Sequence, residues 1–566
     1  MILKGTAASA GIGIGKVYIV SNDLPDYSGV QAGSPEEEKQ RLTDAIAQFR
    51  GMTEEMAEKT RIHVGEKEAG ILEGQLEMIA DPMMEEQMQD AIAGGSSAEA
   101  AAAQVLEFFA SMMRDTGDEM MMQRASDIGD MENRILKILM GIEQISLSDL
   151  TEPTVLVAKD FTPSMTVGIN KDMVAGILTE TGGFTSHTAI LARQMGLPAI
   201  LGIPGVTEAM ADAQTAAVDG RSGKVETDPA GEALAEWEEK LSAWKEELEL
   251  LAQYKEKDTV DADGRTYALY ANIGSPEEAR MAATYSAEGI GLFRSEFLFM
   301  DRTELPTEEE QYEAYKKASD AMRGREVIIR TLDVGGDKEI SYLNLPKEEN
   351  PFLGYRAIRF CLDREEMYRT QLRALLRAGA ENKNIKIMVP LVTCVEEIRR
   401  VKELTEACKA ELEAEGLAYD KDIAVGIMTE TAASAQIADL LAKEADFFSI
   451  GTNDLIQYIM ACDRGNTQIA SLYSPFQPAV LRAIRRIIQS AKEAGIPVGM
   501  CGEAAADPHM IPLLMTWGLD EFSVGVGSVL SVRARIAGIH SAEAKELTDR
   551  VMQAATLAEV RDILGI

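Results

Sequence analysis

Hydrophobic residues follow a helical period through one long segment near the N-terminus and a strand-like pattern on either side of it. Residues 1–20 intersperse glycines with apolar residues before the run KVYIV, which is typical of strand and turn. Between residues 36 and 150 the only proline is Pro82, and apolar residues recur as at Leu72, Leu76 and Ile79. Strand-like runs return at TVLVAKDF and MVAGILTE. We therefore expect the helical block to be inserted into one α/β domain.

The same helical block is rich in methionine, with 13 of the chain's 29 methionines between Met52 and Met140. Flexible thioethers suit a surface that docks a partner adaptably, and they also fill the core of a helical bundle. The sequence leaves both interpretations open.

A charged segment follows, from residue 228 to residue 258. Its large apolar residues lie three or four positions apart: Trp237, Leu241, Trp244, Leu248 and Leu251. This spacing predicts one long amphipathic helix that connects two parts of the chain.

The remaining residues contain eight short apolar runs separated by helical stretches. The runs are ALYANI, GIGLFR, EVIIRT, IKIMVP, AVGIMTE, FFSIGTND, PVGMCGE and FSVGVG. Eight strands alternating with helices are typical of a (β/α)8 TIM barrel. Because active sites of such barrels lie where the strands end, the polar residues at the ends of these runs predict an enzyme.

Length and charge narrow the class of protein. A chain of 566 residues is expected to form about three or four domains. Lys and Arg total 56 against 93 Asp and Glu, which gives a net charge of −37. Nucleic acid and anionic membranes are poor partners for such a chain, whereas a basic protein would be attracted to it.

The cysteines and the N-terminus indicate a cytoplasmic protein. The five cysteines are odd in number and never spaced as CxxC, which is typical of reduced thiols. The N-terminus has no charged leader followed by an apolar core, and no stretch approaches the ~18 apolar residues of a membrane-spanning helix.

Of the four histidines, His187 has the most distinctive surroundings. It lies in TETGGFTSHTAILARQMGLPAI, where glycines make a turn and Thr185 or Ser186 caps a helix that ends at Gly196. A histidine on a first helical turn lies beside unpaired backbone NH groups, which stabilise a phosphoryl group. Imidazole is also a competent nucleophile near neutral pH, so His187 is a candidate phosphoryl acceptor.

The predicted barrel rim carries groups that suit a phosphorylated anion and a divalent cation. Arginines match phosphate and carboxylate oxygens with forked donors, and two carboxylates at neighbouring strand ends suit Mg²⁺. The residues are Arg294, Arg330, Arg356, Arg464, Glu430, Asn453 and Asp454. Any one of them alone could instead form a salt bridge that closes the barrel.

Seven motifs together resemble one known family. They are GGFTSHTAILAR, GLFRSEFLFMDR, RTLDVGGDK, NPFLGYRAIR, GIMTET, FFSIGTNDLIQY with ACDRGN, and GMCGEAA. In this order, over essentially the whole chain, they are similar to enzyme I of the bacterial phosphotransferase system, the phosphoenolpyruvate-protein phosphotransferases.

The resemblance implies a multidomain α/β architecture. Residues 1–22 and 146–227 would form a phosphohistidine α/β domain, and residues 23–145 an inserted helical domain that docks the phosphocarrier HPr. A linker helix would span residues 228–260. Residues 261–566 would form a TIM barrel that binds phosphoenolpyruvate and dimerises. The protein would take phosphoryl groups from phosphoenolpyruvate as the first step of sugar uptake, although the nitrogen-regulatory branch stays open.

The resemblance also implies roles for single residues. His187 would carry the phosphoryl group, with Thr166 as a neighbouring hydroxyl. Arg294, Arg330, Arg356, Arg464, Asn453 and Asp454 would bind phosphoenolpyruvate. Glu430 and Asp454 would hold Mg²⁺, and Cys501 would donate the proton that converts the enolate to pyruvate.

The chain departs from the family pattern at Phe184, where a basic residue is common, and at Ala504 and Ala506, where Leu and Gly are usual. Gln75 and Arg124 are candidate contacts for the carrier.

Two alternatives remain. A pyruvate phosphate dikinase or phosphoenolpyruvate synthase would need an additional ATP-binding module, for which the residues before His187 leave no room. A regulatory protein that senses phosphoenolpyruvate without turnover would not need the reactive groups that this chain retains.

Overall fold

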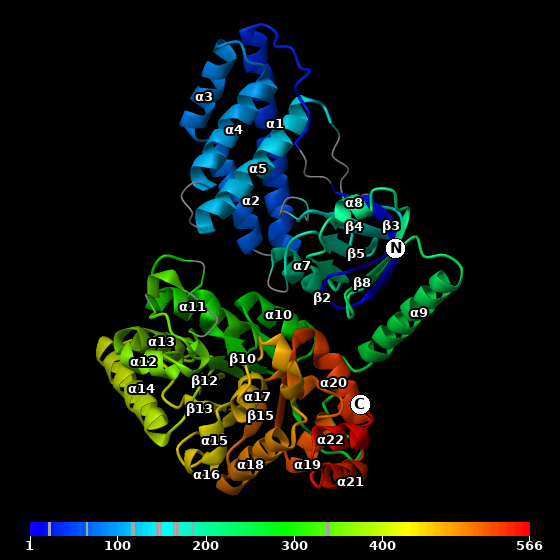
Figure 1. The fold of residues 1–566 in the computed structure, drawn as a ribbon. Coiled ribbons are helices and arrows are strands. Elements are labelled where there is room, and N and C mark those ends of the chain that lie inside the picture. Colours follow the sequence, from blue (N-terminus) through cyan, green and yellow to red (C-terminus); the bar gives the residue numbers. More distant parts are fainter. Residues whose placement is uncertain are drawn as a thin grey trace. The chain divides into compact units, whose positions relative to one another are not determined.

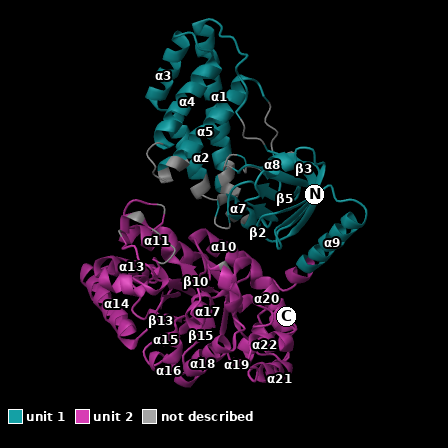
Figure 2. Cartoon of the chain, viewed as in Figure 1, with its two compact units in different colours: residues 1–248 teal, residues 249–566 magenta. Residues whose placement is uncertain are grey.

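The computed structural model divides into two compact units, residues 1–248 and 249–566 (Figure 2). It describes residues 1–20, 24–63, 66–114, 119–142, 147, 150–161, 165, 169–183, 186–300, 302–335, 340–343 and 345–566. Among these residues, none of the helices combines the length and the apolar content that crossing a lipid bilayer requires.

The first unit contains an eight-stranded sheet with the order β1-β8-β7-β3-β4-β5-β6-β2. β3, β4, β5 and β6 are parallel neighbours, and the other pairs are antiparallel. The strands are β1 (Ile2–Lys4), β2 (Thr6–Ser9), β3 (Ile12–Ile19), β4 (Thr154–Ala158), β5 (Val174–Thr179), β6 (Ala199–Leu201), β7 (Thr215–Asp219) and β8 (Lys224–Thr227). One sheet thus combines strands from both sides of the helical block.

The helical block lies in the chain between β3 and β4 (Figure 1). Its helices are α1 (Pro35–His63), α2 (Glu66–Ile79), α3 (Pro82–Ala93), α4 (Ala98–Arg114) and α5 (Glu119–Leu139). Met84, Met88 and Met131 belong to its core, whereas Met83 and Met112 are more than half exposed. The methionines therefore serve both as core residues and as surface residues.

The helix that begins at His187 has well-defined ends. Ser186 is the N-cap of α7 (His187–Met195), and its hydroxyl accepts a hydrogen bond of 3.3 Å from the Ala189 amide. Gly196 ends the helix with φ +70°, a left-handed conformation that favours glycine. Two further helices follow in this part of the chain, α8 (Val206–Ala209) and α9 (Glu232–Ala252).

α9 is shorter than the predicted connecting helix, and both of its tryptophans contact the β7–β8 hairpin. Trp237 is buried, and its indole donates a 3.0 Å hydrogen bond to Glu226 on β8. Arg221, in the hairpin turn, stacks on Trp244 at 4.3 Å and pairs with Glu247 at 2.8 Å. The boundary between the two compact units comes about one helical turn after Trp244, between Leu248 and Glu249.

The second unit is a closed barrel of eight parallel strands, which confirms the predicted TIM barrel. All eight apolar runs of the sequence form its strands. They are β9 (Ala268–Ile273), β10 (Ile290–Arg294), β11 (Val327–Arg330), β12 (Ile385–Val389), β13 (Ala424–Thr429), β14 (Phe448–Ile450), β15 (Val498–Met500) and β16 (Glu521–Gly525).

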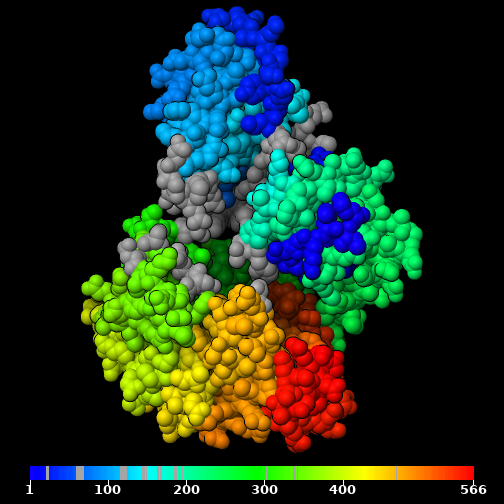
Figure 3. Space-filling view, in the orientation of Figure 1, coloured from blue at the N-terminus to red at the C-terminus, as the bar shows by residue number. Residues whose placement is uncertain are grey.

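Helices surround these strands (Figure 1) and share one large core with them. Figure 3 shows the outer surface of the same elements, coloured from green to red. They are α10 (Pro276–Thr284), α11 (Glu308–Ala321), α12 (Ile358–Asp363), α13 (Glu365–Ala378), α14 (Val395–Glu415), α15 (Ala432–Gln436), α16 (Ala438–Leu441), α17 (Thr452–Met460), α18 (Pro478–Ala494), α19 (Ile511–Trp517), α20 (Val529–Ala537), α21 (Ser541–Val551) and α22 (Leu557–Leu564). Short 3-10 turns follow three of the strands directly or closely: η2 (Ser295–Leu298) after β10, η6 (Glu503–Ala506) after β15 and η7 (Val526–Ser528) after β16.

Candidate active site

The carboxyl ends of the barrel strands bring the predicted rim residues together. Arg294 and Arg330 are the last residues of β10 and β11, and Glu430 follows β13. Asn453 and Asp454 lie in the first turn of α17, after β14, and Cys501 follows β15. Parallel strands of a barrel end on one face, so these residues share one rim.

Arg330 is buried and is held between two carboxylates. It pairs with Glu296, and its Nη1 lies 3.0 Å from Oδ2 of Asp333. These anions raise the pKa of the guanidinium, although burial opposes them. The Nε atom is buried and has no hydrogen-bond partner among the residues that the structure describes. Arg330 therefore retains a donor for a ligand.

Arg356 is a second buried arginine on the same rim. Its Nη2 lies 2.9 and 3.1 Å from the two carboxylate oxygens of Asp333, and its Nη1 donates to the Tyr458 hydroxyl at 3.3 Å. Nη2 is also 3.6 Å from Oδ2 of Asp454. One carboxylate, Asp333, thus serves both Arg330 and Arg356.

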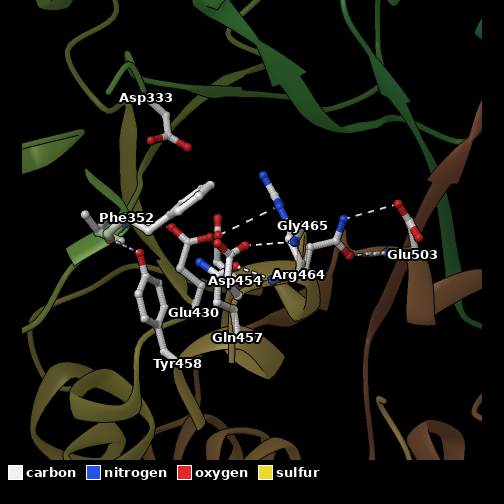
Figure 4. A network of polar contacts seen from close by, with 12 residues as sticks. Asp333, Phe352, Glu430, Asp454, Gln457, Tyr458, Arg464, Gly465 and Glu503 are labelled. Atoms are coloured by element: carbon white, nitrogen blue, oxygen red, sulfur yellow. Dashed lines mark hydrogen bonds and ion pairs between the residues drawn. The ribbon is translucent and has the colours of Figure 1, made fainter. Parts of the chain in front are cut away.

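Glu430 and Asp454 are two buried carboxylates that repel one another. Burial, and next the charges of Asp454 and Asp333, raise the pKa of Glu430. Glu430 Oε1 accepts a 2.7 Å hydrogen bond from the Leu391 amide. In Figure 4 the two carboxylates lie close together, and Arg464 extends toward Asp454, with Nη1 3.9 Å from Oδ1.

This pair fits a divalent cation. Asp454 Oδ1 is buried and accepts no hydrogen bond from the described part of the chain, so an oxygen ligand is available. A cation beside both carboxylates would also remove their repulsion. No group of three or more His, Cys, Asp or Glu in the described chain is arranged to hold a metal ion. A pair of buried carboxylates suits a divalent cation that takes its remaining ligands from substrate oxygens and water.

Asn453 lies at the edge of a pocket of about 330 Å³ whose lining includes Tyr473, Glu503, Ala504 and Ala506. The side-chain amide of Asn453 donates to the Glu503 carboxylate and accepts from the Glu503 backbone NH, both at 3.3 Å. The backbone carbonyl of Asn453 accepts a 3.1 Å hydrogen bond from the Tyr473 hydroxyl. The two alanines are among the positions at which the chain departs from the pattern of the family that it resembles. Small side chains here leave space beside Asn453.

Cys501 is buried inside the barrel, against apolar residues such as Leu292 and Met428. Burial raises the pKa of its thiol to about 11. The sulfur lies 3.9 Å from the Ile450 carbonyl, a weak hydrogen bond that leaves the thiol protonated. At neutral pH the group is an acid that holds its proton.

Three non-glycine residues on the rim loops have positive φ: Ala357 at +51°, Leu391 at +57° and Ala461 at +50°. Ala357 follows Arg356, the Leu391 amide binds Glu430, and Ala461 precedes the turn that carries Arg464. Such strain persists only where surrounding contacts enforce it, and it is common at active sites.

The structure thus brings together most of the predicted rim residues, and Arg294 lies exposed at the end of β10. His187 is in the other unit, at the start of α7. Thr166 and Phe184 lie outside the described residues.

Of the two candidate carrier contacts, Arg124 is exposed. The prediction that Gln75 contacts the carrier at the surface is wrong. Gln75 is buried in the helical block, where it bonds Asp130 and Arg134.

Sequence reasoning missed Asp333 and Glu296. Both lie inside quoted motifs, RTLDVGGDK and GLFRSEFLFMDR. A carboxylate next to a rim arginine was the available signal.

Comparison with known families defines the class. The description "PEP-utilising enzyme, N-terminal" matches residues 4–124, "PEP-utilising enzyme, mobile domain" residues 150–223, and "PEP-utilising enzyme, PEP-binding domain" residues 248–541. The chain is therefore an enzyme of the class that uses phosphoenolpyruvate (PEP).

Relatives that match the full length of the chain identify the family within this class. The phosphoenolpyruvate-protein phosphotransferase of Staphylococcus carnosus (strain TM300) is 42% identical over 99% of this chain and 98% of its own. That of Bacillus subtilis (strain 168) is 42% identical over 99% and 98%. The chain belongs to the phosphoenolpyruvate-protein phosphotransferase family.

A solved structure, the NMR solution structure of Enzyme I (nEIt), is 34% identical. It covers 43% of this chain and 99% of its own, with a TM-score of 0.37.

Proposed function

We propose that this chain transfers the phosphoryl group of PEP to His187 and from there to a histidine of an HPr-like phosphocarrier, releasing pyruvate. The observation that carries the proposal is the barrel rim, where arginines and two carboxylates suit a phosphorylated anion with a cation. Full-length similarity to named phosphoenolpyruvate-protein phosphotransferases supports it.

In this mechanism Arg294, Arg330, Arg356 and Arg464 bind the carboxylate and phosphate oxygens of PEP, and Asn453 adds a neutral donor. Arg330 offers its unpartnered Nε. Glu430 and Asp454 would hold Mg²⁺, which supplies neutralisation of phosphoryl charge when bound. Because these side chains are already held by neighbours, little reorganisation accompanies transfer.

His187 is the proposed acceptor. It begins α7, where the first backbone amides form the positive end of the helix dipole and stabilise a phosphoryl group. Thr166 is the proposed hydroxyl neighbour.

Cys501 is the proposed proton donor to the methylene carbon of the enolate. Its raised pKa keeps the thiol protonated until a strong base, the enolate, forms beside it.

The proposed organisation follows the same logic. Residues 1–22 and 146–227 form the phosphohistidine domain, residues 23–145 dock the carrier, and residues 228–260 link them to the barrel, residues 261–566. We further propose a cytoplasmic homodimer that joins through the barrel. His187 serves two sites, so we infer that the domains reorient between them.

The test is labelling from isotopically labelled PEP with Mg²⁺. His187→Ala should abolish acid-labile phosphate on the protein while PEP binding, measured by calorimetry, stays within about threefold, because the binding site lies in the other unit. His540→Ala is a matched control, since His540 is exposed and its ring makes a polar contact with Asp263 at 3.4 Å, in the other unit from His187. Undiminished labelling of His187→Ala would move the acceptor elsewhere. A wild-type chain that binds PEP without labelling would instead favour a regulatory sensor.

A further inference from the structure

We infer that Asp333 is a positioning residue for phosphoryl transfer: it fixes Arg330 and Arg356 in one arrangement and holds Arg356 Nη2 at 3.6 Å from Asp454 Oδ2, so that Arg356 comes no closer to that carboxylate. The inference rests on the proposed function of the rim. It concerns a residue that contacts the arginines rather than the substrate.

The first observation is that one buried carboxylate is divided between two arginines. Asp333 Oδ2 lies 3.0 Å from Arg330 Nη1, and Oδ1 lies 2.9 Å from Arg356 Nη2 and 3.3 Å from Arg356 Nε. Asp333 is only 3% exposed. Charge-assisted contacts of this kind fix the planes of both guanidinium groups.

The second observation is that the backbone around Asp333 is itself held. The Leu332 amide donates 3.0 Å to Gln371 Oε1, and Gln371 in turn binds Ser295 and Tyr315. On the other side, the Val334 carbonyl accepts from the Ala357 amide at 3.2 Å. Hydrogen bonds therefore fix the backbone of both residues that flank Asp333.

The third observation is the close approach of the two loops. Gly335 has φ +106°, and a Cβ placed there would lie 2.6 Å from Cβ of Arg356. Only glycine permits this approach. Ala357, next to Arg356, tolerates a strained φ of +51°. The loop that carries Asp333 thus holds the backbone of Arg356 as well as its side chain.

The consequence follows from what each arginine would retain without Asp333. Arg330 keeps Glu296, and Arg356 keeps Tyr458 and the 3.6 Å contact with Asp454. Arg356 would then move toward Asp454, the proposed cation ligand. Binding of PEP should persist, because loss of a carboxylate leaves the rim more positive. The rate of transfer should fall, because the donors no longer meet the phosphoryl oxygens.

This difference separates a positioning role from a purely structural one. We expect the single-turnover rate of His187 phosphorylation by labelled PEP to fall about 10- to 100-fold in full-length Asp333→Asn. The PEP concentration that gives half the maximal rate should change less than about threefold. Asp333→Glu restores the charge one methylene farther out and should recover part of the rate.

Asp261→Asn is the matched control. Asp261 is also buried and hydrogen-bonded, but it precedes β9 and so lies at the opposite end of the barrel. Its variant should lose thermal stability and retain the transfer rate of the folded protein. Asp333→Asn with a wild-type rate, or a rate lowered only in proportion to its folded fraction by circular dichroism, would overturn the inference. Failure of the wild-type chain to label would instead overturn the proposed function.

Discussion

A buried thiol at the rim shows how one residue's environment prepares its chemistry. Cys501 lies among apolar side chains, and burial raises the pKa of the thiol to about 11. A thiolate nucleophile would need the opposite, a lowered pKa. The environment of Cys501 therefore suits an acid that releases its proton only to a strong base.

We predict that Cys501→Ala still allows PEP to phosphorylate His187 but slows steady-state release of pyruvate about 10²- to 10⁴-fold, the usual contribution of a positioned acid. Cys501→Ser should recover only part of this rate, because a serine hydroxyl is the weaker acid. Single-turnover labelling and continuous assay of pyruvate measure the two steps separately.

Cys408→Ala is the control for Cys501, since Cys408 is equally buried but lies on α14 outside the rim. Its turnover should match the wild type. Pyruvate release by Cys501→Ala at the wild-type rate would show that water or another side chain supplies the proton.

At the scale of elements, the buried side chain of Trp237 anchors α9. Trp237 is 2% exposed, and its ring centroid lies 5.2 Å from Lys224 Nζ and 5.0 Å from Lys240 Nζ. We predict that Trp237→Ala destabilises the packing of α9 on the β7–β8 hairpin by about 3 kcal/mol. Hydrogen exchange of the amides of residues 232–244 should then become much faster.

Trp237→Phe separates the two contributions, because it keeps an aromatic ring and loses the hydrogen bond to Glu226. It should raise the exchange rate only modestly, in line with about 1 kcal/mol for one hydrogen bond. Unchanged exchange in Trp237→Ala would mean that Trp244 and Arg221 hold the helix without it.

Local patterns predicted the helices and strands well, because the spacing of apolar residues within a short segment shows which side chains its element buries. The eight apolar runs became the eight strands, and the turn glycines and Ser186 predicted the start of α7. The three- and four-residue spacing also predicted α9, but not that Trp237 is buried on β8, a contact between separate elements. Asp333 was missed although Arg330 lies three residues before it, because its second partner, Arg356, lies 23 residues away. The sequence around Gln75 does not indicate that this side chain is buried, because its partners Asp130 and Arg134 lie 55 and 59 residues away.

At the scale of the whole molecule, two anchors define the segment that joins the units. On the first unit, Arg221 holds Trp244. On the second, the fully buried Arg533 donates to the Tyr254 carbonyl at 3.1 Å and to the Thr259 hydroxyl at 3.0 Å. We infer that any reorientation uses the residues between Trp244 and Tyr254, because contacts fix the chain on either side.

These anchors also determine where the chain can be divided. A cut near Glu226 would break β8, which pairs with both β1 and β7, and would remove the α9 residues that cover the hairpin. A cut after Leu248 preserves all of these contacts. The fragment 1–248 therefore retains its sheet, α7 with His187, and the anchored part of α9.

We predict that the fragment 1–248 accepts phosphate on His187 from a phosphorylated HPr-like carrier yet gains none from PEP, because every proposed PEP ligand lies after residue 248. Its fold is checked by circular dichroism against the full chain, and the His187→Ala fragment controls for labelling at other residues. Adding the separate fragment 249–566 should restore PEP-dependent labelling only slowly, since the two reacting groups are no longer tethered and their effective concentration falls. Labelling of the fragment 1–248 by PEP alone would show that the first unit contains a complete PEP site and would contradict the division of labour between the two units.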